Sequence, residues 1–82
     1  MDIKPGDLLA VQPFAPYTHY IISTGKRGYY ISNEVPFVVL EVISFNGNFL
    51  AELKVLTSCG IKGNVLFQVE HLKKIYTHEY EH

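Results

Sequence analysis

The sequence contains a single cysteine, Cys59, among its 82 residues, no tryptophan and no excess of positive charge. One cysteine excludes an intrachain disulfide, and one thiol alone does not build a structural zinc site. Seven Lys and Arg stand against eight Asp and Glu, which gives a formal net charge of −1. Most nucleic-acid binders carry a basic surplus because phosphate contacts supply much of their affinity. The charge balance therefore argues against nucleic acid as the main partner.

Long apolar runs are also missing. No stretch approaches the roughly 20 apolar residues that a membrane-spanning helix needs. Residues 1–6 show no basic region followed by an apolar run, which a signal peptide would have. A lone cysteine is compatible with a reducing compartment. These features predict a cytoplasmic protein without a membrane partner.

What the chain has instead is short runs of Val, Ile, Phe and Tyr separated by Gly, Pro and Asn. This pattern is typical of strands and turns, and no segment keeps a helical period. With 48% hydrophobic residues, the chain can supply the core of one small all-β domain. We expect this domain over residues 1–76 and a C-terminal tail over 77–82. The predicted strands are 7–11, 19–24, 29–32, 37–45, 49–57, 63–69 and 73–76.

The Asn46-Gly47 pair predicts a hairpin between the fourth and fifth of these strands, because both central residues of a type I′ turn need positive φ. A two-residue loop would place residues opposite each other when their numbers add up to 93. One face of the hairpin would then be apolar and belong to the core. That face would carry Val38, Leu40, Val42 and Ser44 opposite Val55, Leu53, Ala51 and Phe49.

The other face of this hairpin would be half apolar, and it would place Glu41 directly opposite Glu52, which is mildly unfavourable. Either another part of the barrel covers its apolar residues, or a partner or second copy of the chain does so. The second interpretation makes Phe37, Ile43 and Leu50 candidate contact residues.

A second hairpin is predicted around residues 25–28, with Lys26 and Arg27 at its tip. Tyrosines flank it, and tyrosine is favoured at interfaces because it buries a large area yet keeps a polar end. The same mixture of aromatic and basic residues can stack on single-stranded nucleic acid, which keeps that alternative open. The candidate contact residues of this region are Tyr17, Tyr20, Lys26, Arg27, Tyr29 and Tyr30.

Two patterns suggest chemistry, and neither supports a catalytic site. Residues 78–82 match the zinc-protease motif H-E-x-x-H, but a five-residue helix after the last strand would fray and has no third ligand. Cys59 lacks a recognisable oxyanion-binding loop that would make it a nucleophile with His19 or His71. We interpret both histidines as surface or turn residues, and we expect no enzyme activity, cofactor or metal site.

Three segments resemble SH3 domains: residues 47–51 (Gly-Asn-Phe-Leu-Ala), 60–65 (Gly-Ile-Lys-Gly-Asn-Val) and 72–75 (Leu-Lys-Lys-Ile). The resemblance implies a small SH3-like barrel of about five strands with a long hairpin excursion after the first strand. The residues with which SH3 domains bind proline-rich peptides are absent. There is no tryptophan, residues 66–69 read Leu-Phe-Gln-Val instead of Pro-Ser-Asn-Tyr, and the tip of the excursion is basic instead of acidic.

A looser resemblance links the opening Gly6-Asp7-Leu8-Leu9, the Val-Leu-Glu-Val run at 39–42 and the final Leu-x-x-Ile to short SH3-like proteins of tailed phages and bacteria. It implies a phage protein of the host cytoplasm that binds a host or viral protein. The leading hypothesis is therefore a non-catalytic protein-interaction module. A small nucleic-acid-binding barrel and a homo-oligomeric structural component are the alternatives.

Overall fold

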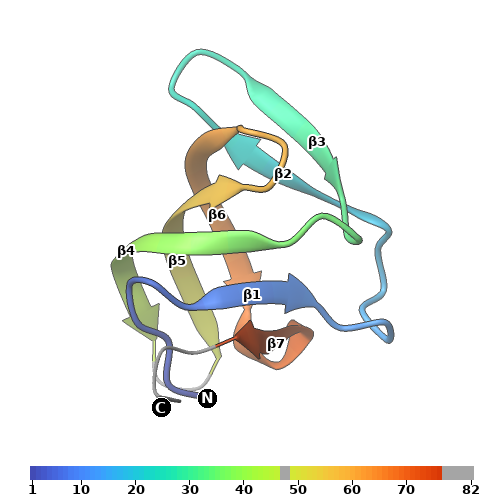
Figure 1. Cartoon of the computed structure of the whole chain (residues 1–82), viewed down its shortest axis with the longest axis vertical. Helices are drawn as coiled ribbons and strands as arrows, with labels where there is room; N and C mark the ends of the chain where they lie inside the picture. The colour runs from blue at the N-terminus through green and yellow to red at the C-terminus, as the bar shows by residue number, and fades with distance from the viewer. Residues whose placement is uncertain (47–48, 77–82) are drawn as a thin grey trace.

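Seven antiparallel strands curl into one sheet that forms a half-barrel (Figure 1). The computed structural model describes residues 1–46 and 49–76. A single turn of 3-10 helix, η1 (Val69–His71), precedes the last strand. The strands are β1 (Leu8–Val11), β2 (His19–Ser23), β3 (Gly28–Ser32), β4 (Phe37–Asn46), β5 (Leu50–Thr57), β6 (Lys62–Gln68) and β7 (Leu72–Tyr76).

The all-β prediction is confirmed, and every strand boundary lies within one residue of its predicted position. The expectation of about five barrel strands is wrong, because the sheet contains seven in the order β3-β2-β6-β5-β4-β1-β7. The predicted hairpin after the first strand consists of β2 and β3, and it joins the sheet through a single pair between β2 and β6, Ser23 with Asn64. The predicted tail, with its H-E-x-x-H motif, and residues 47–48 of the predicted turn lie outside the described residues.

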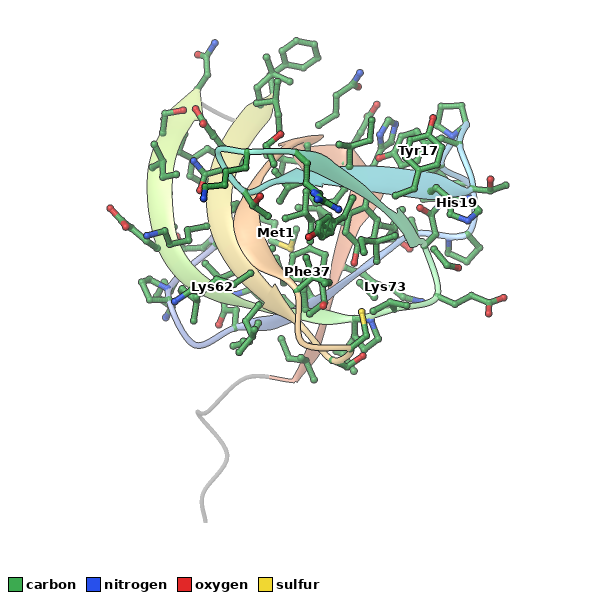
Figure 2. All side chains as sticks on the ribbon, turned by 90° about the horizontal axis from the view of Figure 1, so that it is seen from above. Met1, Tyr17, His19, Phe37, Lys62 and Lys73 are labelled. Carbon is green, nitrogen blue, oxygen red and sulfur yellow. The ribbon has the colours of Figure 1, made fainter. Side chains whose placement is uncertain are left out.

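Three aromatic rings from three strands form the centre of the core. The ring centroids of Tyr20 and Phe37 are 5.7 Å apart, those of Tyr20 and Phe67 5.4 Å, and those of Phe37 and Phe67 5.5 Å. Phe37 and Phe67 stack with an interplanar angle of 5°. Figure 2 shows Phe37 inside the curl of the sheet. Aromatic contacts of this kind add to the free energy gained from burial, so the three strands are held together at one point.

The register of the β4–β5 hairpin differs from the predicted one. Pairs from Phe37–Thr57 to Val39–Val55 add up to 94, and two bulges raise the sum to 96 at Asn46–Leu50. At the turn end the sum already differs from the predicted 93, because Asn46 lies in β4 and pairs with Leu50 instead of occupying the turn. Each bulge then inserts one extra residue, Leu40 and then Ile43, and so changes locally which side chains of β4 face inward. The predicted core face is correct on β5 for Ala51, Leu53 and Val55. On β4 it is wrong for Leu40 and Ser44, which are exposed.

Phe37 and Val39 are fully buried, so their predicted place on the outer face is wrong. The observed register also lacks the unfavourable pair of carboxylates. Glu41 lies opposite Lys54, and Glu52 lies opposite Ser44. Since opposite charges stabilise a cross-strand pair and like charges destabilise it, the observed register is electrostatically better than the predicted one.

A buried carboxylate anchors the N-terminal segment. Asp7 accepts a hydrogen bond from the backbone N–H of Lys4 (2.9 Å) and lies 3.3 Å from Nζ of Lys74 on β7. Burying a carboxylate is costly unless it is paired and hydrogen-bonded, and Asp7 has both kinds of partner. The start of β1 is thereby held against β7. Within the described residues, no helix is long and apolar enough to cross a lipid bilayer.

The Tyr20 hydroxyl links the core to the β3–β4 connection by donating to the carbonyl oxygen of Val35 (2.8 Å). Burial, and secondarily the charge of Cys59, raises the pKa of Tyr20 far above its usual range. A raised pKa in the folded state stabilises the fold below the unfolded pKa of about 10, and this contribution is lost as the pH rises above it.

We predict that Tyr20→Phe lowers the free energy of unfolding at neutral pH by about 1 kcal/mol, because the Val35 carbonyl loses its donor. The variant should also lose stability less steeply than the wild type above about pH 10. Thermal unfolding followed by circular dichroism across this pH range measures both effects. Tyr30→Phe is the matched control, since Tyr30 is exposed. An equally steep alkaline loss in Tyr20→Phe would contradict the assignment.

Candidate functional site

A groove of about 700 Å³ lies between the β2–β3 hairpin and the outer face of β5 and β6. It exists because β2 and β6 are paired at one position only, Ser23 with Asn64. Continued along the strands, this register would place Ile21 opposite Leu66, but no pairing between the two strands is present there. The groove is therefore the space that opens where the two strands separate.

Gly63 determines how closely β2 approaches β6 at the closed end of the groove. A Cβ atom on Gly63 would lie 2.5 Å from the backbone oxygen of Ser23 and 2.7 Å from Cγ2 of Ile22. Contacts this short are not tolerated, so only glycine allows the Ser23–Asn64 pair to form. The φ angle of Gly63 is not positive, so any residue could adopt its backbone conformation. Glycine is needed at this position because there is no room for a side chain.

Side chains, not backbone, connect the two sides at the other end. The Tyr17 hydroxyl lies 3.0 Å from Nδ1 of His71, and the two rings make an edge contact at 5.4 Å. The Tyr17 carbonyl accepts a hydrogen bond from the Asn33 side chain, which fixes the loop before β2. Burial raises the pKa of the Tyr17 hydroxyl, so it stays protonated. His71 lies in η1, which agrees with the turn alternative of its prediction, and its side chain is buried.

The floor of the groove is made by core side chains, whereas exposed apolar side chains form its walls. Tyr20, Val65 and Phe67 line the floor. Ile21 and Tyr30 belong to one wall and are 50% and 75% exposed, and Leu66 of the other wall is 63% exposed. Three large apolar side chains from three strands thus face solvent around one depression.

Apart from the tyrosines, six of the residues that line the groove are polar: His19, Ser23, Glu52, Asn64, Gln68 and His71. The ring of His19 stacks on that of Tyr30, with centroids 5.7 Å apart and an interplanar angle of 23°. Figure 2 shows His19 close to Tyr17, at the same end of the molecule. Among the described residues, Glu52 is the only Asp, Glu, Lys or Arg that lines the groove, and no ion pair involving it is present. The groove therefore carries one unpaired negative charge.

Four of the predicted contact residues line this groove: Tyr17, Tyr20, Tyr30 and Leu50. Tyr20 contributes to the floor only, because most of its surface is buried. The other five are placed elsewhere. Phe37 is inside the core, Ile43 is exposed in the second bulge of β4, and Lys26 and Arg27 are exposed in the β2–β3 turn. The Arg27 guanidinium lies 5.8 Å from the ring centroid of Tyr29.

Sequence reasoning missed Ile21, His19, Glu52 and Leu66 as groove residues. Val65 and Phe67 of β6 are buried, so by the alternation of a strand Leu66 between them points outward. The pairing of β2 with β6 was not predictable from the pattern, and only this pairing brings Ile21 to the same groove.

The described residues do not form a metal centre, since no group of three His, Cys, Asp or Glu side chains is placed to hold an ion. Cys59 is exposed in the β5–β6 turn, where its Sγ atom lies 3.1 Å from Oγ1 of Thr57. Comparisons of the chain with protein-family models, with curated proteins and with solved structures found no match.

We predict that Gly63→Ala destabilises the domain by about 2 kcal/mol, because the added methyl group forces β2 away from β6. Gly60→Ala is the comparison, since its φ of +92° is unfavourable for alanine but no atom lies within 4 Å of the added Cβ. That change should cost about 1 kcal/mol. Chemical denaturation measures both values. A smaller effect for Gly63→Ala than for Gly60→Ala would contradict the close approach.

Proposed function

We propose that this chain is an SH3-like half-barrel that acts as a non-catalytic protein-interaction domain, with the groove between β2 and β6 as its contact site. The observation that carries the proposal is the exposure of Ile21, Tyr30 and Leu66 around one depression. Large apolar side chains gathered on the surface of a small domain are typical of interaction sites. The all-β architecture, with a single 3-10 turn before the last strand, is compatible with the SH3-like assignment. A phage origin and a host or viral partner remain predictions from the resemblance.

The nucleic-acid alternative has weaker support. Its basic residues, Lys26 and Arg27, lie at the β2–β3 turn and not in the groove, and the groove carries a negative charge. Phosphate binding needs cations beside the stacking surface. Association of identical chains is supported by the exposed side chains of Leu40, Ile43 and Phe45 on β4, away from the groove.

We predict that the double variant Tyr30→Ser/Leu66→Ser loses most of the protein partners that the wild-type domain captures. Both side chains are exposed, so the fold should be retained while the apolar walls are removed. The measurement is quantitative capture on immobilised domain from a lysate of the source cell, with thermal unfolding as a check on folding.

Ile75→Ser is the matched control for this experiment, because Ile75 is half-exposed on β7 and does not line the groove. Partners should be retained by this variant. If the double variant captures the same proteins as the control, the groove is not the contact site. If captured material is nucleic acid and is released steeply by salt, the nucleic-acid alternative replaces the proposal.

A further inference from the structure

The backbone of β2 has free hydrogen-bonding groups on the side that faces β6. In an antiparallel pair, residues alternate between those that bond to the partner strand and those whose N–H and C=O point away from it. The backbone carbonyl oxygen of Arg27 accepts a hydrogen bond from the backbone N–H of Thr24. That of Thr18 accepts one from the backbone N–H of Asn33. Both bonds fit the β2–β3 register, so by alternation the backbone groups of Tyr20 and Ile22 point toward β3. Those of His19, Ile21 and Ser23 therefore point toward β6.

The backbone groups of β6 also alternate, between those that bond to β5 and those that point toward β2. The carbonyl oxygen of Phe49 accepts from the N–H of Val69, and that of Ile61 accepts from the N–H of Thr57. Both bonds fit the β5–β6 register, in which the pair numbers add up to 118. By alternation, Val65 and Phe67 bond to β5, and the backbone groups of Asn64, Leu66 and Gln68 point toward β2. The Ser23–Asn64 pair confirms this direction independently, because it joins one residue from each set.

Beyond that pair, the backbone groups of His19 and Ile21 face those of Leu66 and Gln68 without pairing, and all four residues line the groove. Unpaired N–H and C=O groups of strands are a template for another strand. We propose that the groove binds a short extended segment of a partner protein, which inserts between β2 and β6 as an additional strand. This inference rests on the proposed function and names the occupant of the same site.

The size and direction of the segment follow from the two strands. Asn64 is already paired with Ser23, so the free stretch of β6 runs from Leu66 to Gln68. At about 3.3 Å per residue it spans about 7 Å, which suits three extended residues. Because β2 and β6 are antiparallel, the inserted strand runs antiparallel to one and parallel to the other. The Tyr17–His71 contact closes the far end of the groove, so the segment lies between this contact and the Ser23–Asn64 pair.

The side chains of the groove select the chemistry of the segment. Outward-pointing residues of the segment would meet the exposed apolar side chains of Ile21, Tyr30 and Leu66. Glu52 supplies the single unpaired charge, so a Lys or Arg is favoured over an acidic residue. The occupant is therefore an extended, β-branched segment with one basic residue.

The test uses defined peptides with the full chain. The probe is acetyl-Thr-Val-Arg-Val-Thr-amide, and a second peptide carries Glu in place of Arg. Two further versions of the probe are N-methylated at alternate residues, so that each lacks the N–H groups along one edge. Nuclear magnetic resonance titration gives the affinities and shows whether the amide signals of Ile21 and Leu66 shift.

The Arg peptide should bind, and the Glu peptide should bind several-fold more weakly. Each N-methylated peptide should bind at least about tenfold more weakly than the Arg peptide, because it loses its backbone hydrogen bonds to one of the two strands. Glu52→Gln should abolish the preference for Arg. Glu41→Gln, which changes an exposed side chain of β4 outside the groove, should retain it. These results support insertion.

Other outcomes overturn it. If N-methylation of one edge has no effect, the peptide pairs with one strand only and does not insert. If neither N-methylated version is weakened, binding uses side chains alone; insertion is then wrong, while the groove remains a contact site. If no peptide binds at millimolar concentration, the inference fails, and the proposed function is decided separately by the capture experiment with Tyr30→Ser/Leu66→Ser.

Discussion

The backbone pair between Ser23 and Asn64 joins the β2–β3 hairpin to the rest of the sheet, and Gly63 makes this pair possible. Any side chain at residue 63 would collide with the backbone of Ser23. At this point the sheet is continuous. Beyond it β2 and β6 separate, so one steric constraint creates both the seven-stranded sheet and the groove. The position of the hairpin, and with it the candidate site, depends on this contact.

The aromatic core explains why the strands can separate without the fold coming apart. Tyr20 reaches inward from β2 and packs against Phe37 and Phe67, so side chains hold the hairpin where backbone pairing has ended. The Tyr17–His71 contact has the same role at the far end of the groove. Hydrophobic packing thus replaces sheet hydrogen bonds along β2, and the backbone groups released in this way face the groove. Fold and candidate site are two consequences of the same arrangement.

The sequence predicted the positions of the strands well, and it predicted their register and pairing less well. Val, Ile and aromatic runs predicted all seven strands, and alternation predicted the buried residues Ala51, Leu53 and Val55 of β5. The register of β4 was wrong because Asn46, predicted as a turn residue, lies in the strand and pairs with Leu50, and because two further shifts occur at Leu40 and Ile43. The apolar pattern shows none of these changes, and Phe37 was therefore assigned to the outside.

The groove itself could be predicted only in part. Tyr17, Tyr30 and Leu50 were candidates because tyrosine and an apolar outer face are typical of interfaces, and these residues line the groove. Ile21 and Leu66 were missed because they meet through the β2–β6 pairing, which is a contact between segments about 40 residues apart. Such pairings depend on how the whole sheet closes, and local periodicity does not report them.

The open groove requires that the backbone groups of β2 and β6 are unpaired beyond Ser23 and Asn64. Residue-resolved hydrogen exchange of the free domain tests whether they are. The amides of Ile21 and Leu66 should exchange at least about tenfold faster than those of their neighbours Ile22 and Val65, which bond to β3 and β5. Equal protection of Ile21, Ile22, Val65 and Leu66 would mean that β2 and β6 are fully paired in solution. In that case there would be no open groove for a partner to enter.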